Sequence, residues 1–317
     1  MNDIITIGEA MIVFDPNTTG PMNFVHQFER KVGGAELNFA IGCSRLGLQS
    51  SWMSALGNDP FGRNIYNFAR GEGIDVSKVK FVNQYPTSLN FKEINENGNV
   101  NTYYYRDKSP ILTLSTDDID EVYIKEAKIL HITGVFAAIS PEIVMPIIKK
   151  ALKLAKKHNT LVSFDPNIRL KMWSKSEAKE YLLEILPYVD ILLAGEDELS
   201  IMFDTENHDK MIEKCLQYNI NDIIIKRGES GSIGYRAGEK IFASPIKVGK
   251  VVDTVGAGDG FNAGYIYSYL KGWSLEKSLN FANTIGAMVV EVKGDNEGLP
   301  YLANVEVRLG EKEWIER

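Results

Sequence analysis

The chain has 317 residues, of which 44% are hydrophobic, and this is enough for one large α/β domain with a substantial core. A formal net charge of −7 without a basic cluster argues against binding to nucleic acid or to an anionic membrane surface. Two cysteines far apart in the sequence argue against a disulfide framework, and no apolar run approaches a membrane span, so we expect a cytoplasmic globular protein.

The first elements are predicted as a strand, an irregular stretch and a helix. Residues 4–7 are predicted to form a buried strand that ends at Gly8 and Glu9. Residues 11–31 are an irregular stretch rich in Asn, Thr, Gly and Pro with isolated aromatics, which could include short strands outside the main sheet. Residues 33–47, GGAELNFAIGCSRLG, are typical of a glycine turn that runs into a helix. Glu36 and Asn38 at its start could cap the helix or hold the hydroxyls of a sugar, and the residues alone favour capping.

Residues 81–113 differ in character, because Asn97-Gly98 between strand-like flanks predicts a hairpin. Strand side chains alternate, so Tyr104 and Arg106 share one face while Tyr103 and Tyr105 share the other. Aromatic side chains on both faces indicate a small sheet that covers another part of the protein. We expect a β lid built from about residues 11–32 and 81–113, inserted in a single domain that spans residues 1–317.

From residue 128 onward, short apolar runs alternate regularly with helical segments. This pattern predicts an α/β fold, with a mostly parallel central sheet covered by helices on both faces. Each apolar run ends in polar residues, and ligands of open parallel sheets bind beyond the carboxyl ends of the strands. The residues that we expect near one crevice are Asp165, Asn167, Arg169, Glu196, Glu198, Lys226, Arg227 and Gly228.

Residues 251–264, VVDTVGAGDGFNAG, predict a glycine loop at the start of another helix. Glycines permit close backbone approach, and the free N–H groups of a first helical turn favour an anion such as phosphate. Asp259 could take a proton from a hydroxyl that attacks the phosphate, or it could merely cap the helix. The motifs GxxxxGK[ST] and GxGxxG after the first strand are absent from the sequence, so P-loop and Rossmann nucleotide sites are poorly supported.

Residues 33–47 and 253–265 resemble the two signature regions of the PfkB, or ribokinase-like, family of sugar kinases, in the same order. The resemblance implies a ribokinase-like three-layer αβα domain, ATP as phosphoryl donor, Mg²⁺ on its phosphates and a sugar hydroxyl as acceptor. It implies that Asp259 is the base and that the amides of Gly256, Ala257 and Gly258 form an anion hole. The implied nucleotide-binding residues are Asn167, Lys226, Arg227, Gly228, Gly231, Gly256, Gly258 and Asn283.

The resemblance also suggests cation sites. Glu198 matches the glutamate of the family's Asn-x-x-Glu motif, which is associated with the water shell of Mg²⁺, although Gly195 stands at the asparagine position. Asp253 and Thr254 lie in the region of a monovalent cation site of the family.

Within the family, four motifs together resemble 2-keto-3-deoxygluconate kinases most closely: GGAELN (residues 33–38), TYYYR (102–106), FDPNIRLKMW (164–173) and GDNEGLPY (294–301). The implied substrate-binding residues are Gly34, Ala35, Glu36, Leu37, Asn38, Asn90, Tyr104, Arg106, Arg169 and Asp295. The chemistry is reasonable, because arginine recognises a carboxylate by charge-assisted, bidentate hydrogen bonds. Two departures stand out, since Asn90 replaces an expected tyrosine and Ser109-Pro110 replaces a pair of small residues.

The alternatives are a fructokinase or another neutral-sugar kinase and, from a different class, a non-catalytic sugar-binding regulatory protein on the same fold. Relatives often pair through the lid, so the resemblance also implies a homodimer or a higher homo-oligomer formed through the β lid.

Overall fold

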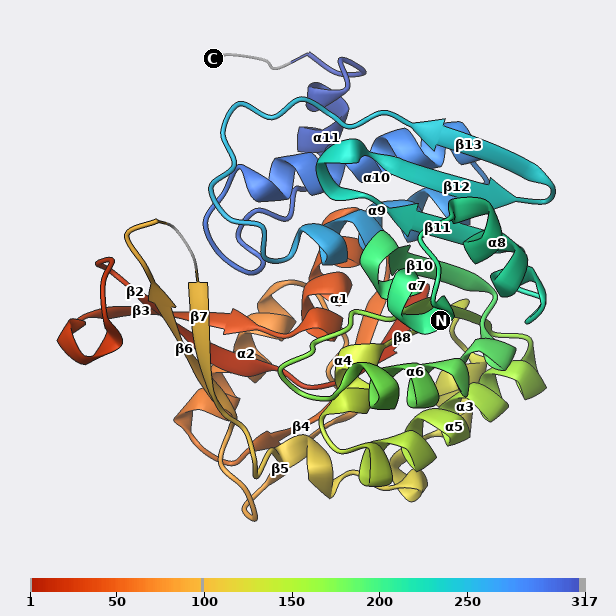
Figure 1. Cartoon of the computed structure of the whole chain (residues 1–317). Helices are drawn as coiled ribbons and strands as arrows, with labels where there is room; N and C mark the ends of the chain where they lie inside the picture. Colours follow the sequence, from red (N-terminus) through yellow and green to blue (C-terminus); the bar gives the residue numbers. More distant parts are fainter. Residues whose placement is uncertain (1, 98–99, 314–317) are drawn as a thin grey trace.

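A large twisted sheet forms the centre of the computed structural model, which describes residues 2–97 and 100–313 (Figure 1). Its strands are β1 (Ile4–Ile7), β4 (Ser50–Gly57), β5 (Val79–Val82), β8 (Ile129–Thr133), β9 (Leu161–Asp165), β10 (Ile191–Gly195), β11 (Asp222–Lys226), β12 (Ser232–Arg236) and β13 (Glu239–Ala243). The spatial order is β13-β12-β11-β10-β9-β8-β1-β4-β5. Neighbours from β5 to β11 are parallel, whereas β12 and β13 continue the sheet as antiparallel strands.

Helices cover both faces of this sheet, which confirms the predicted three-layer architecture. One face is covered by α1 (Ala35–Arg45), α2 (Pro60–Gly71), α9 (Ala257–Leu270), α10 (Leu275–Val290) and α11 (Leu302–Arg308). The other is covered by α3 (Glu121–Lys125), α4 (Gly134–Ala138), α5 (Pro141–His158), α6 (Lys175–Leu183), α7 (Glu196–Phe203) and α8 (His208–Leu216). Short 3₁₀ turns lie at η1 (Met22–Phe24), η2 (Pro110–Thr113), η3 (Thr116–Asp118), η4 (Leu186–Tyr188) and η5 (Gly228–Ser230).

The apolar strands of the centre are buried on both faces. In β11 the three isoleucines Ile223, Ile224 and Ile225 are fully buried, and they divide between the two hydrophobic layers. Strands of this kind need helices on both sides, because neither face can be left in water. Because β1, β8, β9, β10 and β11 run parallel, their carboxyl ends lie at one edge of the sheet.

A second sheet stands beside the first and forms the β lid, the projecting lobe in Figure 1. Its strands are β2 (Met11–Pro16), β3 (Phe28–Gly33), β6 (Leu89–Ile94) and β7 (Val100–Tyr105), in the order β3-β2-β6-β7. β6 and β7 form the predicted antiparallel hairpin, while Gly98 of its turn lies outside the described residues.

The lid is narrower than the expected ranges of 11–32 and 81–113. Phe81 and Val82 belong to β5 and pair with β4 in the large sheet, because an apolar run that follows α2 completes a parallel crossover. Residues 106–113 contain no strand, and their regular structure is the turn η2.

Both cysteines, Cys43 and Cys215, are buried and unpaired, in agreement with the sequence. Among the described residues, no helix is both long enough and apolar enough to cross a membrane.

Candidate active site

The start of α9 is shaped by the glycine loop that precedes it. Gly256 is the N-cap, with a φ of 77°, and a Cβ at this position would clash with the backbone oxygen of Asp295. Only glycine accepts this backbone conformation together with so close a neighbour. The first N–H groups of α9 have no partner within the helix, and a Cβ at Gly258 would lie 3.8 Å from Nζ of Lys226. The helix start therefore combines free amides, a partial positive charge and a lysine ammonium, which suits a phosphate group.

Asp259 lies in the first turn of α9 and is 9% exposed. Asn38 of α1 donates a hydrogen bond of 3.0 Å from its Nδ2 to Oδ2 of Asp259. Burial raises the pKa of Asp259 to about 7, the negative charge of Asp165 adds to this, and the bond from Asn38 opposes it. A carboxyl group that is poised near neutral pH can act as a general base.

Glu36 does not cap α1, and neither does Asn38, so the capping expected from the residues alone is wrong. The N-cap is Gly34, which makes no side-chain cap, and Glu36 instead accepts a hydrogen bond from Oγ1 of Thr133. Burial raises the pKa of Glu36 to about 7, with further contributions from the charges of Asp259 and Glu9. The side chain of Asn38 is engaged by Asp259, while the carboxylate of Glu36 accepts from Thr133 as well as from its own backbone N–H.

Arg106 follows β7 and is held by Glu9, a residue that the sequence did not single out. The guanidinium donates from Nη2 to Oε2 of Glu9, while Ser109 and Ser88 both donate to Oε1, the latter at 2.6 Å. Glu9 is 4% exposed. Because this carboxylate is buried and fully engaged, Arg106 is fixed in place and its positive charge is largely balanced.

Arg169 differs from Arg106 because its side chain is exposed and makes no ion pair with any described residue. It nevertheless lies near the site, since its charge lowers the pKa of Asp259 against the larger effect of burial. Arg169 is therefore an available cation beside the buried carboxyl group.

The remaining sugar-side residues divide into two groups. Tyr104 and Asn90 face each other across β6 and β7, on one side of the lid. Asn90 is 6% exposed; its amide nitrogen contacts Sδ of Met11 at 3.0 Å, and within the described structure its Oδ1 has no partner. Ala35 begins α1, but the side chain of Leu37 is fully buried in the core, so only its backbone could touch a ligand.

Asp165, at the end of β9, organises the residues behind the start of α9. Its Oδ2 accepts from Nζ of Lys226 at 3.0 Å and from Nδ2 of Asn262 at 2.6 Å. Its Oδ1 accepts the backbone N–H of Asn167, whose φ of 37° is unusual for a residue other than glycine. This network holds the ammonium of Lys226 beside Gly258. Asn262 was not predicted, although it lies one turn after Asp259.

Two of the expected nucleotide-side residues, Arg227 and Asn283, lie near residues 242–244 at the end of β13. Arg227 lies 5.7 Å from the ring centre of Phe242 and 3.5 Å from a carboxylate oxygen of Glu196. Asn283 of α10 donates to the backbone oxygen of Ser244 at 3.3 Å. Gly228 and Gly231 both have positive φ values. The structure thus brings Arg227 and Asn283 to residues 242–244.

Glu198 accepts two backbone hydrogen bonds, from Gly195 at 2.6 Å and from Ile168 at 3.0 Å. Burial raises its pKa, and the negative charge of Asp165 raises it further. Because both carboxylate oxygens of Glu198 are engaged, Glu198 fits the water shell of Mg²⁺ rather than direct coordination.

Comparison with known proteins agrees with this geometry. Residues 1–302 match the model of the pfkB family carbohydrate kinases. The chain belongs to this family. It is 33% identical over 304 residues to a 2-dehydro-3-deoxygluconokinase from Thermoproteus tenax, covering 95% of this chain and 92% of that protein. It is 32% identical over 311 residues to a 5-dehydro-2-deoxygluconokinase from Geobacillus kaustophilus (strain HTA426), covering 96% and 92%.

Among solved structures, the carbohydrate kinase is similar to a putative ribokinase II from E. coli in complex with ATP and Mg²⁺. The TM-score is 0.91 at 26% identity, and the match covers 98% of this chain and 100% of that one. The predicted ribokinase-like fold is confirmed. The chain is a phosphotransferase with an alcohol group as acceptor, and ATP with Mg²⁺ is the donor that its family implies.

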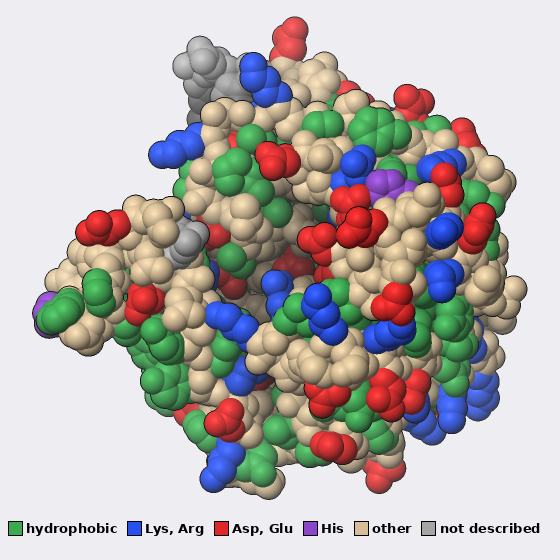
Figure 2. All heavy atoms as spheres, in the orientation of Figure 1, with side chains coloured by type: hydrophobic (Ala, Val, Ile, Leu, Met, Phe, Trp, Pro, Cys, Tyr) green, Lys and Arg blue, Asp and Glu red, His purple; other side chains and the backbone are tan. Residues whose placement is uncertain are grey.

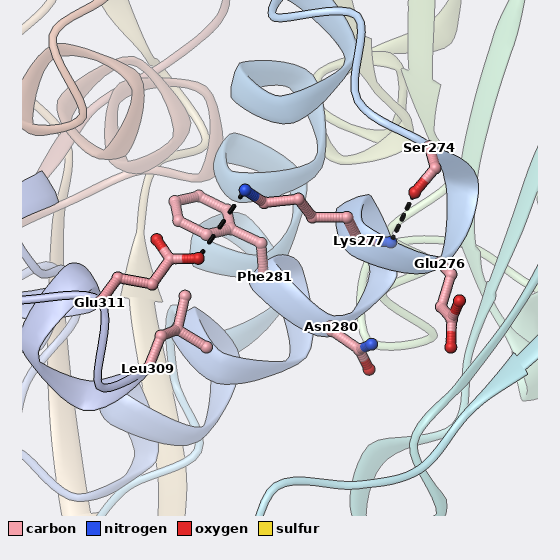
Figure 3. Close-up of a pocket in the computed structure, with 7 residues that line it drawn as sticks. All are labelled: Ser274, Glu276, Lys277, Asn280, Phe281, Leu309 and Glu311. Carbon is pink, nitrogen blue, oxygen red and sulfur yellow. Dashed lines mark hydrogen bonds and ion pairs between the residues drawn. The ribbon is translucent and has the colours of Figure 1, made fainter.

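Figure 2 shows a hollow between the β lid and the main body of the kinase, with acidic and basic side chains around it. A separate surface pocket of about 370 Å³ lies between the first half of α10, which follows the far end of α9, and the residues after α11 (Figure 3). Its lining residues are Ser274, Glu276, Lys277, Asn280, Phe281, Leu309 and Glu311. The 14 residues of α9 span about 21 Å at 1.5 Å per residue, so this pocket is remote from Asp259.

Proposed function

We propose that this carbohydrate kinase transfers the γ-phosphoryl group of ATP to the terminal hydroxyl of 2-keto-3-deoxygluconate, with Asp259 as general base. The observation that carries the mechanism is the position of Asp259, buried in the first turn of α9 next to free amides and Lys226. Phosphoryl transfer requires mainly positioning and charge stabilisation, and a helix start supplies both.

In the proposed step, Asp259 accepts the proton of the sugar hydroxyl as its oxygen attacks the γ-phosphorus. The bond between the γ-phosphorus and the β–γ bridging oxygen breaks, and ADP leaves. The amides at Gly256, Ala257 and Gly258 and the ammonium of Lys226 stabilise the charge on the transferred group. Glu198 would hold the water shell of a bound Mg²⁺, which would further neutralise the charge on the ATP phosphates. The lid excludes water during transfer.

The sugar acid is the proposed acceptor class for two reasons. Arg169 is an exposed cation near Asp259 and makes no ion pair among the described residues, so it is free to bind a carboxylate. The relatives named above are kinases of dehydro-deoxygluconates, as their names state. In this proposal Arg106 contributes its remaining N–H groups while Glu9 holds it in place.

One observation favours a second candidate, a neutral-sugar kinase. Glu9 balances the charge of Arg106, and Asn90 offers a buried oxygen that could accept a hydrogen bond from a sugar hydroxyl. A neutral ketose would use such groups and would leave Arg169 in solvent.

A substrate panel tests the proposal. Purified protein with ATP and Mg²⁺ is assayed for ADP formation with 2-keto-3-deoxygluconate, 5-keto-2-deoxygluconate, fructose and ribose. We expect kcat/KM to be highest for 2-keto-3-deoxygluconate and to exceed that for the neutral sugars by about 100-fold, since a charge-assisted hydrogen bond from Arg169 to the carboxylate contributes about 1.5–3 kcal/mol. A higher kcat/KM for 5-keto-2-deoxygluconate would contradict the named acceptor. Equal rates on fructose would support the second candidate. Sugar binding without turnover of any acceptor would support a non-catalytic protein.

A homodimer through the β lid is part of the proposal. Tyr103 and Tyr105 are 42% and 65% exposed on the lid face opposite Tyr104. Exposed aromatics of this kind are common at protein interfaces. Analytical ultracentrifugation of the wild type and of a Tyr103→Ser, Tyr105→Ser variant tests it, and a monomeric wild type would contradict it.

A further inference from the structure

A cluster of buried charges joins the β lid to the main body. It comprises Asp15, Lys31 and Lys92 from the lid strands β2, β3 and β6, together with Asp295 from the loop after α10, and we call it the lid charge cluster. The side chains are between 1% and 12% exposed. Four ionisable groups removed from water in this way carry a large desolvation cost, which their mutual contacts must offset.

The contacts run across the boundary between lid and body. Nζ of Lys92 lies 2.8 Å from Oδ1 of Asp295 and 3.4 Å from Oδ1 of Asp15. Nζ of Lys31 donates to the backbone oxygen of Lys293 at 3.2 Å and lies 3.7 Å from Oδ2 of Asp15. Lys92 keeps a raised pKa despite its burial, because the charges of Asp295 and Asp15 outweigh the cost of desolvation. It is therefore a buried cation held by the body of the protein.

These lid residues lie on the side that carries Asn90 and Tyr104. Val13 pairs with both Lys31 and Asn90, and Asp15 and Lys92 each lie two residues further along their strands, so all share one face of the lid. The cluster thus touches the same side of the lid as the proposed sugar contacts.

Asp295 connects this face to both glycine loops of the active site. Its carboxylate lies against Gly33, where a Cβ would meet Oδ2, and its backbone oxygen lies against Gly256, where a Cβ would meet that oxygen. Gly33 leads into α1, which carries Asn38, and Gly256 leads into α9, which carries Asp259. One residue therefore contacts the lid, the sugar-side loop and the proposed anion hole.

We infer that Lys92 is a positioning residue for phosphoryl transfer. Its ion pair with Asp295 fixes the position of the lid over the active site. With Lys92 in place, the lid and the two glycine loops adopt one relative position, and water is excluded from the site. Without it, the lid keeps its own strand pairing but loses its fixed position over Gly33 and Gly256. A displacement of about 1 Å at reacting groups can lower the rate by as much as about 100-fold.

The test compares Lys92→Met with Lys92→Arg and with a matched control. Arg236→Met removes the cation from a partly buried pair, in which Nε of Arg236 lies 2.6 Å from Oδ2 of Asp222. Asp222 lies at the start of β11, at the opposite end of the strand from Lys226. Each variant is assayed for kcat and KM with the best acceptor of the panel above, for ATP hydrolysis without sugar, and for its melting temperature.

We expect Lys92→Met to lower kcat/KM for the sugar by about 10-fold to 100-fold and to raise the ratio of ATP hydrolysed to sugar phosphorylated, because the lid no longer excludes water. Lys92→Arg should recover most of the loss. Arg236→Met should lower the melting temperature but leave KM and the ratio unchanged. If Lys92→Met fails to fold, the charge-balanced double variant Lys92→Met, Asp15→Asn replaces it and should show the same kinetic defect.

A Lys92→Met protein, or the double variant, that loses stability like Arg236→Met while keeping wild-type KM, kcat and hydrolysis ratio would overturn the inference. The inference rests on the proposed function, but the two fail differently. If the proposed role of the α9 start is wrong, Asp259→Asn retains turnover; if only the inference is wrong, Asp259→Asn is inactive and Lys92→Met is kinetically normal.

Discussion

Asn38 Nδ2 donates a hydrogen bond of 3.0 Å to Oδ2 of Asp259, and it joins two residues that are 221 positions apart in the chain. The bond is made possible by the close packing of α1 on α9. A Cβ at Gly42 would lie only 2.8 Å from Cβ of Ala263, so glycine at this position lets the helices approach. The charged form of Asp259 is thus stabilised by a residue from the opposite end of the sequence.

Replacing Asn38 by alanine should raise the pKa of Asp259 further, because the charged carboxylate loses a donor. A hydrogen bond to a charged group contributes about 1.5–3 kcal/mol, so the acid limb of the kcat/KM profile should move up by about one to two pH units. Profiles between about pH 5 and 9 measure this. Asn221→Ala, at an exposed asparagine, is the control, and an unshifted limb in Asn38→Ala would contradict the assigned contact.

Glu36→Gln should move the acid limb of the kcat/KM profile to lower pH, opposite to the effect of Asn38→Ala. Asp259 raises the pKa of Glu36, and by reciprocity the charge of Glu36 disfavours ionisation of Asp259. Gln keeps a partner for Thr133 but removes the charge, so activity should persist to lower pH than in the wild type. Because the two carboxyl groups titrate as a coupled pair, the apparent pKa of the acid limb is a property of the pair and not of Asp259 alone. An upward shift would show that Glu36 does not act on Asp259 through its charge.

Asp259→Asn should lower kcat by about 100-fold to 10,000-fold, which is the range for loss of a general base. ATP affinity should change little, since the amides at the start of α9 and Lys226 remain. Single-turnover phosphoryl transfer and equilibrium nucleotide binding give the two quantities. Asp197→Asn, at an exposed acid in the first turn of α7, is the matched control. Undiminished turnover in Asp259→Asn would rule out the proposed base.

The Asp259→Asn variant should be more stable than the wild type above about pH 7, because it lacks the buried carboxyl group of Asp259, which must ionise there. The pKa of Asp259 is raised from 3.8 in the unfolded chain to about 7 in the folded protein. Between these values the folded state binds more protons, so stability falls as pH rises, and the full cost is present above the folded pKa. The Asp259→Asn protein avoids this cost, which is on the order of a few kcal/mol. Urea unfolding at about pH 5 and about pH 8 should show the gain of the variant growing with pH; a constant difference would argue against a raised pKa.

Arg169→Ala should reduce kcat/KM for a sugar acid by about 10-fold to 100-fold, the effect of losing a charge-assisted hydrogen bond of about 1.5–3 kcal/mol. Its melting temperature should stay normal, because the side chain is exposed. Arg106→Ala, in contrast, should lower both kcat/KM and the melting temperature, since the buried carboxylate of Glu9 is left without its cation. Lys175→Ala, at an exposed lysine six residues further on, is the control. Unchanged acid kinetics in Arg169→Ala would favour the neutral-sugar kinase.

The sequence was sufficient for the elements that repeat regularly. The apolar runs at β8, β9, β10 and β11 are buried on both faces, and their regular alternation with helical segments indicated parallel strands with polar residues at one edge. The glycine loop at Gly256 was also visible, since its backbone conformation demands glycine.

The contacts between lid and body were not predictable in this way. Glu9, Thr133 and Lys92 make their decisive contacts with residues that lie 97, 97 and 203 positions away, and no local spacing marks such partners. For the same reason capping was assigned to Glu36 and Asn38, because a local rule cannot weigh a tertiary competitor. The sequence left Arg106 without a partner, since nothing in it indicated that Glu9 would fold against the guanidinium.

The passage of the chain between lid and body has a mechanical consequence. Four connections join the lid to the body: residues 8–10 between β1 and β2, Gly34 between β3 and α1, residues 83–88 between β5 and β6, and residues 106–109 between β7 and η2. Three of them carry residues of the proposed sugar side, namely Glu9, Gly34 and Arg106. A lid that swings open must turn about these residues. Several residues about which the lid turns are therefore also proposed sugar-binding residues. A substitution that makes lid opening easier, and so speeds product release, will also weaken binding of the sugar.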